Sequence, residues 1–176
     1  MKIYISGTTR GLGNALFDTL VNAGHDVIGL NRPDFDMAKG LSNYLKNDFD
    51  VFIINAHFRW KQVDLLYKLF ELNKERLCQI ITIGSVSADG DRKQVNSYAI
   101  EKKALDATCT QLQLVPSRCI LTNVKLGRME TDMVANKKVA KMKPEMVAEF
   151  IMKILTQNES KLYVKSITID LKHENY

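Results

Sequence analysis

The sequence has little of what marks secreted, membrane-spanning or metal-binding chains. Its three cysteines are odd in number and show neither C-x-x-C nor metal-ligand spacing, so we interpret them as buried free thiols. The three histidines are scattered, and we expect no metal site. No apolar run approaches the roughly 20 residues of a membrane span, and no signal peptide opens the chain. We therefore expect a cytoplasmic protein with no membrane partner.

Excess charge is also modest. The formal net charge is +5 and the pI is about 9.0, but basic residues are spread along the chain. One dense cluster comprises Lys137, Lys138, Lys141 and Lys143. It has no interleaved aromatic residues, which favours a solvated lysine face over a nucleic-acid site. With 176 residues, 45% of them hydrophobic, we expect one domain over residues 1–176.

A glycine-rich stretch near the start of the chain is the most informative one. The apolar, β-prone residues 3–5 are followed by Gly7, Gly11 and Gly13 in the spacing G-x-x-x-G-x-G. A strand, a glycine turn and a helix start in this order let backbone N–H groups face a pyrophosphate. The alternative is an ordinary tight turn between a strand and a helix. A helix predicted over 11–23 and a strand over 25–30 complete a βαβ unit, which favours the nucleotide site.

Apolar patterning predicts strands and helices in alternation along the whole chain. The further predicted strands are 34–36, 50–56, 78–83, 119–124 and 164–171. The further predicted helices are 37–45, 61–76, 96–114 and one that begins at Pro144. This alternation predicts an α/β fold, a doubly wound parallel β-sheet with helices on both faces. Ligands of such sheets bind at the carboxyl ends of the strands.

Two polar side chains near the start of the predicted helix 96–114 suggest acid–base chemistry. Tyr98 and Lys102 lie four residues apart, so they share one helix face. A neighbouring cation favours the phenolate, and we expect it to lower the pKa of Tyr98 and make this residue a general acid or base. Ser85 follows the preceding strand and can bind the same substrate oxygen. The alternative is a solvated tyrosine and lysine on an exposed helix.

As a set, these motifs resemble the short-chain dehydrogenase/reductase family. SGTTRGLG at 6–13 is similar to its T-G-x-x-x-G-x-G turn, and Asn55-Ala56 to its N-A-G element. Ser85 with YAIEK at 98–102 is similar to its catalytic serine and Y-x-x-x-K. GRMET at 127–131 is similar to its P-G-x-x-x-T loop. The matches fall in family order and cover nearly the full length.

The resemblance implies a Rossmann-like, NAD(P)-dependent oxidoreductase that transfers a hydride between nicotinamide and a small carbonyl or alcohol substrate. It implies that Ser85 orients the substrate oxygen, that Tyr98 exchanges the proton, and that Lys102 holds the nicotinamide ribose. It also implies a homo-oligomer, a dimer or tetramer. The cofactor-binding residues implied are Gly7, Thr9, Arg10, Gly11, Leu12, Gly13, Asn31, Arg32, Asn55, Ala56, Tyr98, Lys102, Gly127 and Thr131.

The choice of cofactor can be argued from charge. An acidic residue after the second strand would accept hydrogen bonds from a ribose 2′-hydroxyl, whereas arginine favours a 2′-phosphate. Here Asn31-Arg32 follows that strand and Arg10 lies in the glycine turn. Both arginines favour NADP(H), although Asp34 lies nearby. We expect NADP(H) to be preferred and NAD(H) to be possible.

The departures from the family pattern leave other functions open. The family's catalytic asparagine has no assigned counterpart, because 57–83 is short and Asn73 is its only asparagine. His57 stands where the family has glycine, and Leu126 where it has proline. The segment 129–143, where the family builds its substrate lobe, is short. One alternative is therefore a non-catalytic dinucleotide-binding sensor or scaffold. Another is a sugar-nucleotide epimerase or reductase, which the lack of a C-terminal substrate domain disfavours.

Overall fold

Six parallel strands form one sheet in the computed structural model, which describes residues 1–33, 35, 48–90, 96–130, 141–156 and 162–171. The strands are β1 (Lys2–Ser6), β2 (Asp26–Leu30), β3 (Val51–Ile54), β4 (Gln79–Ser85), β5 (Ile120–Leu126) and β6 (Ser166–Ile169). They lie in the order β2-β1-β3-β4-β5-β6, and every neighbouring pair is parallel.

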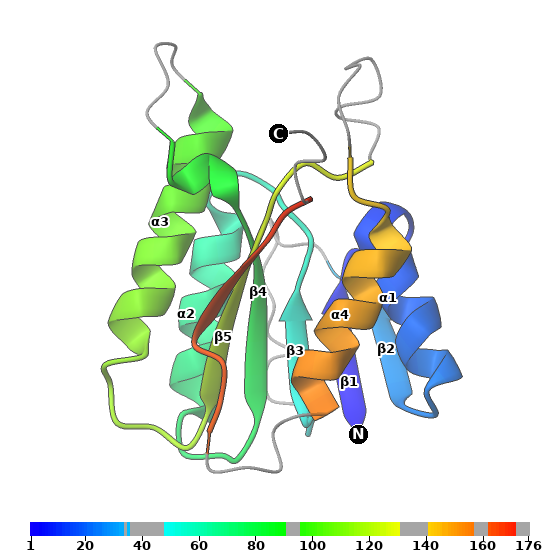
Figure 1. Cartoon of the computed structure of the whole chain (residues 1–176). Helices are drawn as coiled ribbons and strands as arrows, with labels where there is room; N and C mark the ends of the chain where they lie inside the picture. Colours follow the sequence, from blue (N-terminus) through cyan, green and yellow to red (C-terminus); the bar gives the residue numbers. More distant parts are fainter. Residues whose placement is uncertain (34, 36–47, 91–95, 131–140, 157–161, 172–176) are drawn as a thin grey trace.

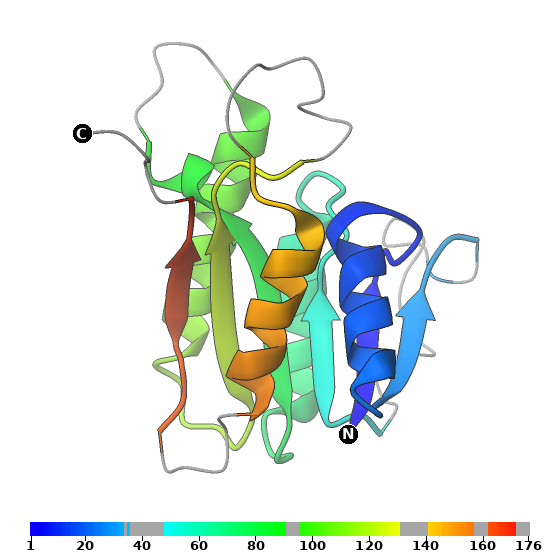
Figure 2. The same cartoon turned by 45° about the vertical axis from the view of Figure 1, so that its right-hand side comes forward.

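Helices cover both faces of this sheet (Figures 1 and 2). α1 (Gly11–Asn22) packs beside α4 (Pro144–Thr156) on one face, and α2 (Lys61–Asn73) packs beside α3 (Ser97–Leu112) on the other. Each face has its own hydrophobic cluster. The doubly wound α/β fold predicted from the alternating pattern is therefore confirmed.

Local sequence explains the main elements. β3 and β4 are buried at every residue, as expected of central parallel strands covered on both sides. Asn96 caps α3, and its side chain accepts a hydrogen bond from the backbone N–H of Ala99 at 3.2 Å. Pro144 occupies the first position of α4, where its missing N–H costs no hydrogen bond. No described helix is long and apolar enough to cross a membrane.

The strand order reverses between β1 and β3, because the chain moves from β1 outward to β2 and then returns to the other side of β1. Loops that follow β1 and β3 therefore diverge at the carboxyl edge of the sheet, which is where ligands of such folds bind. The predicted strand 34–36 is not seen at Phe35, which is buried and lies in a bend. The rest of that segment, and the predicted helix 37–45, lie outside the described residues.

Candidate functional site

The glycine turn after β1 is shaped for close backbone approach. Gly7 has φ +76°, a left-handed conformation that favours glycine, and its N–H donates to the carbonyl of Leu30 at 2.9 Å. A Cβ on Gly13 would overlap the carbonyl oxygen of Gly7 and lie 2.6 Å from Asn55 Nδ2. The first turn of α1 receives no side-chain cap from Arg10. Its free N–H groups and the helix dipole make this turn suitable for a phosphate.

Side chains of β1 and the loop after β3 hold this turn. Asn55 Nδ2 donates to the carbonyl oxygens of Ser6 at 3.2 Å and Gly7 at 2.9 Å. The hydroxyl of Ser6 accepts from the backbone N–H groups of Asn55 and Ala56, each at 3.1 Å. The amide nitrogen of Asn55 thus fixes the protein backbone. Its role in binding the cofactor stays a prediction.

The loop after β2 is joined to the same turn. Asn31 Oδ1 accepts from the backbone N–H of Thr8, and Asn31 Nδ2 donates to the Thr8 hydroxyl, both at 2.8 Å. This pair of bonds places the adjacent Arg32, which is exposed, at the same edge as the glycine turn. Thr8 was absent from the site predicted from sequence, because its role depends on a contact across 23 residues.

Substituting Gly13 with alanine is expected to destabilise the protein by about 1–3 kcal/mol, as for other overpacked sites. The added methyl group would have to displace the Gly7 carbonyl and the Asn55 amide. Urea unfolding followed by circular dichroism measures this change. Gly90→Ala is the matched control, because a Cβ there meets nothing within 4 Å. Equal stability of the two variants would contradict the tight contact.

Ser85 and Tyr98 meet at the carboxyl end of β4. Ser85 is the last residue of that strand and is 7% exposed, while Tyr98 lies in the first turn of α3 and is half-buried. Burial raises the pKa of Tyr98, and a hydrogen bond with Ser85 opposes that rise. The expectation that Lys102 lowers this pKa is therefore wrong for the protein as it stands. Desolvation of the phenolate outweighs the stabilising contacts.

Lys102 does not lower the pKa of Tyr98 because its amine points into the protein. Nζ donates to Gln62 Oε1 at 2.8 Å and to the carbonyl oxygen of Ile83 at 2.7 Å, and the residue is 3% exposed. Nζ lies 5.6 Å from the centre of the Tyr98 ring. Burial lowers the pKa of Lys102 from 10.5 to about 7, although Glu101 opposes this. The helical spacing correctly placed the pair on one face, but that face is buried.

Gln62 is the site residue that sequence reasoning missed. It lies in the first turn of α2, 2% exposed, and its Nε2 donates to the carbonyl of Ile54 at 3.1 Å while its Oε1 accepts from Lys102. It therefore joins the ends of β3 and β4 to α3. Asn73, the one asparagine of 57–83, lies in the last turn of α2, away from the site, and donates to Leu69 at 2.8 Å.

His57 and Glu101 form a second polar pair beside Tyr98. His57 Nε2 lies 2.9 Å from Glu101 Oε2, and its ring meets the Tyr98 ring edge-on with centres 5.0 Å apart. Burial first, and then the positive charge of Lys102, lower the pKa of His57, while Glu101 raises it. Burial thus disfavours the charged form of His57, and the carboxylate of Glu101 favours it. This histidine of the loop after β3 therefore lies beside the tyrosine of the candidate site.

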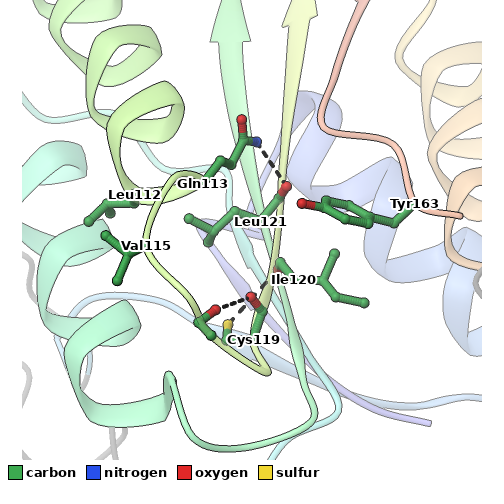
Figure 3. A pocket seen from close by; sticks show the side chains of 8 residues that line it. Leu112, Gln113, Val115, Cys119, Ile120, Leu121 and Tyr163 are labelled. Carbon is green, nitrogen blue, oxygen red and sulfur yellow. Dashed lines mark hydrogen bonds between the residues drawn. The ribbon is translucent and has the colours of Figure 1, made fainter. Parts of the chain in front are cut away.

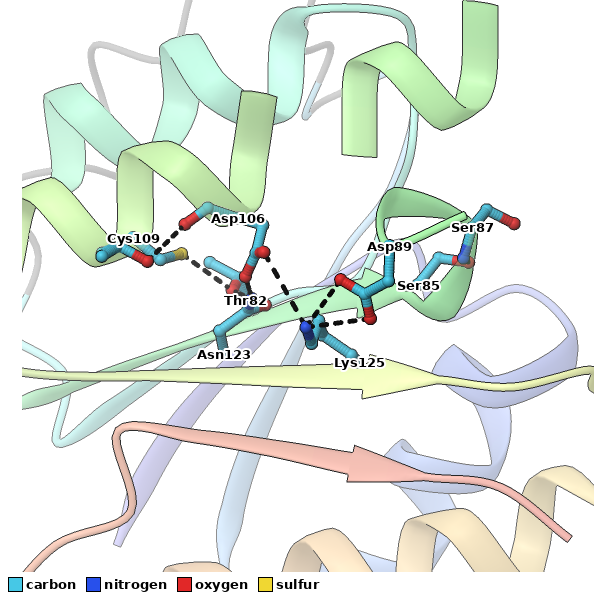
Figure 4. Close-up of polar contacts among 9 residues, drawn as sticks. Thr82, Ser85, Ser87, Asp89, Asp106, Cys109, Asn123 and Lys125 are labelled. Carbon is cyan, nitrogen blue, oxygen red and sulfur yellow. Dashed lines mark hydrogen bonds and ion pairs between the residues drawn. The ribbon is translucent and has the colours of Figure 1, made fainter. Parts of the chain in front are cut away.

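A row of polar contacts seats α3 on the sheet (Figure 4). Asn123 of β5 donates to Asp106 of α3 at 2.8 Å and accepts from Thr82 of β4 at 2.8 Å. Further along β5, Lys125 Nζ contacts both carboxylate oxygens of Asp89 at 2.9 and 3.0 Å. Asp106 thus ties α3 to β5, through Asn123 and through Lys125, whose Nζ lies 3.8 Å from the Asp106 carboxylate.

The remaining predicted residues that the structure describes lie at the same edge and differ in exposure. Thr9, Arg10 and Gly11 are exposed, whereas the Leu12 side chain is 4% exposed in the hydrophobic core, which leaves only its backbone for a ligand. Gly127 N–H donates to Ile169 at 2.8 Å. Thr131 lies outside the described residues. Within the described part of the chain, no group of three or more histidine, cysteine or acidic residues could hold a metal.

Comparison with solved structures places this geometry in a known fold. The neighbours include a short-chain dehydrogenase from Burkholderia cenocepacia in complex with NADP, with TM-score 0.76, 16% identity, and coverage of 97% of this chain and 90% of that one. Serine dehydrogenase from Escherichia coli has TM-score 0.72, 17% identity and coverage of 96% and 97%. The 3-alpha-hydroxysteroid dehydrogenase from a Pseudomonas species, complexed with NADH, has TM-score 0.68 and 20% identity, and the match covers 97% of this chain and 95% of that one.

These structures share the arrangement of the sheet and helices described above. No family model and no curated protein matches the sequence. The chain therefore has the Rossmann-like fold of the short-chain dehydrogenases/reductases, as the motifs predicted.

Proposed function

We propose that this protein is an NADP(H)-dependent oxidoreductase of the short-chain dehydrogenase type, acting on a small carbonyl or alcohol substrate. The observation that carries this proposal is the meeting of Ser85, Tyr98 and Lys102 at the carboxyl edge that also bears the glycine turn. A hydroxyl and a phenol beside a buried amine, at the same sheet edge as the glycine turn, suit proton exchange with a substrate oxygen.

The residues present fit a dinucleotide. The glycines let the turn pack closely against its own backbone and against Ala56, and the start of α1 that follows, which has no side-chain cap, suits a pyrophosphate. The exposed Arg32 suits a 2′-phosphate. Bound nicotinamide supplies or accepts the hydride. The NADP and NADH complexes of proteins with this fold support the same ligand class.

Residues of the chain itself would donate the proton that the substrate oxygen needs during reduction. Tyr98, protonated because burial raises its pKa, donates its proton to the carbonyl oxygen during reduction, and Ser85 holds that oxygen. The phenolate that remains needs a nearby positive charge. Lys102, when protonated, is the available cation, with Gln62 and the Ile83 carbonyl keeping it in place. His57, whose ring meets the Tyr98 ring edge-on, borders this site.

The first experiment is calorimetric titration with NADPH and, separately, with NADH. We expect NADPH to bind more tightly, and Arg32→Ala to weaken NADPH binding roughly tenfold or more, because hydrogen bonds to charged groups contribute about 1.5–3 kcal/mol. NADH binding should hardly change. Arg118→Ala, an exposed arginine before β5, is the matched control. If neither dinucleotide binds, the proposed oxidoreductase function is wrong.

A sensor or scaffold that binds the dinucleotide without turnover is the second candidate. The inward direction of Lys102 and the raised pKa of Tyr98 favour it.

We further propose one domain over 1–176 with a shortened substrate lobe, and a homo-oligomer. The cytoplasmic location stays a prediction from sequence.

A further inference from the structure

Two cysteines far from the candidate site lie side by side. Cys78 and Cys119 directly precede β4 and β5, whose register pairs Gln79 with Ile120. The N–H of Ile120 donates to the carbonyl of Cys78 at 2.8 Å, so the register extends back to pair the two cysteines. Paired residues of neighbouring parallel strands lie about 4.8 Å apart, within the range of roughly 4.4–6.8 Å that a disulfide spans between Cα atoms.

The two cysteine side chains also lie on the same face of the sheet. Both belong to the hydrophobic cluster under α2 and α3, each 5% exposed, and a hydrogen bond joins them. That bond lowers the pKa of Cys78, and Arg76 lowers it further, while burial opposes both. The same bond and burial raise the pKa of Cys119. Of the two, Cys78 is the thiol that ionises more readily, and thiolates are the reactive species.

A cavity at the opposite end of the strands from the glycine turn reaches one member of the pair, Cys119. Figure 3 shows Cys119 in the wall of that cavity, below Gln113 and Leu121, with Tyr163 on the other side. The third cysteine, Cys109, is placed differently. It is 2% exposed, hydrogen-bonded to Thr82 at 3.3 Å, and burial raises its pKa to about 12.

We propose that Cys78 and Cys119 are a modification site, where a peroxide oxidises the two thiols to an internal disulfide. The Cys78 thiolate attacks one peroxide oxygen, the O–O bond breaks, and a sulfenic acid and hydroxide form. The hydroxide takes the proton of Cys119 and becomes water. The Cys119 sulfur attacks Cys78 Sγ, which forms the S–S bond and breaks the S–O bond. The hydroxide that leaves takes up the proton that Cys78 lost on ionisation and becomes the second water. In total, two thiols lose two electrons and two protons, and hydrogen peroxide becomes two waters.

This disulfide would tie the first residues of β4 and β5 together and enclose α3 in a covalent loop. It stabilises the fold by restricting the unfolded chain. Because the pair lies at the amino ends of the strands, the proposal is independent of the proposed oxidoreductase function.

The test treats the full chain with hydrogen peroxide, alkylates remaining thiols and measures its mass. We expect two of the three cysteines to resist alkylation and dithiothreitol to restore them. Trypsin should release one cross-linked pair, residues 77–92 with 119–125, because Arg76, Arg92, Arg118 and Lys125 border those segments. The peptide 104–118, which contains Cys109, should stay alkylated.

Variants separate the pair from general oxidation. Cys78→Ser and Cys119→Ser should each abolish the disulfide, and Cys109→Ser, the matched control, should keep it. The linked peptides of the unaltered protein provide the result even where a serine variant fails to fold. Oxidation of single cysteines to sulfinic acid without the linked peptides, or a linkage that includes Cys109, would overturn the proposal.

Discussion

Tyr98→Phe is expected to lower kcat for carbonyl reduction by roughly 10²- to 10⁴-fold, the range that general acid catalysis contributes, while NADPH binding stays nearly unchanged. The substitution removes only the hydroxyl that meets Ser85 and leaves the ring against His57 in place. NADPH absorbance with a panel of aldehydes, ketones and diketones measures turnover, and calorimetry measures binding.

Tyr67→Phe is the matched control for this variant. It removes the same hydroxyl from a tyrosine that is 40% exposed on α2 and bonded to Gln111 at 3.5 Å, so turnover should not change. Turnover that survives in Tyr98→Phe would show that this phenol is not the proton donor. NADPH binding without turnover of any substrate in the unaltered protein would favour the sensor.

The resemblance to a family and the apolar pattern predicted the frame of the site. Gly7, Asn55 and Ser85 lie at strand ends because short apolar runs precede them, and those runs are the buried strands. Parallel strands bring such ends to one edge. Local sequence patterns are thus sufficient to predict the position of a site residue that directly follows a buried strand.

The partners of the key side chains could not be predicted in this way. Gln62 lies at a helix start, and nothing in its neighbours along the chain shows that it accepts a hydrogen bond from Lys102, 40 residues later. Helical spacing says that Tyr98 and Lys102 share a face, but not that the face is buried. Burial depends on the packing of α2 against α3, and it reverses the expected pKa shift of Tyr98.

The buried amine of Lys102 gives the second large expected effect, on the pH dependence of stability. Its folded pKa is about 7, lowered from 10.5. Between these two values the unfolded chain binds one more proton at this site than the folded protein, so the free energy of unfolding rises with pH across this window. Below about pH 7 both states carry the ammonium, and stability is lower by a constant amount. The difference across the window is on the order of a few kcal/mol.

Lys102→Met should remove this rise. The variant leaves Gln62 Oε1 and the Ile83 carbonyl without their donor, which lowers stability at every pH but adds no titration between pH 7.5 and 10. His57, whose pKa lies below 6.5, titrates outside that interval. The unaltered protein should therefore gain stability relative to the variant as pH increases through the interval. Urea unfolding at several pH values, followed by circular dichroism, measures both curves.

The control for this comparison is the next residue of α3. Lys103 is exposed, so Lys103→Met removes an equal charge from the same helix without removing a buried amine, and its stability curve should run parallel to that of the unaltered protein. If the Lys102→Met curve is parallel as well, the amine is not held neutral by burial. Lys102 would then carry its charge throughout the pH interval from 7.5 to 10, and the Tyr98 phenolate would have a permanent cation beside it.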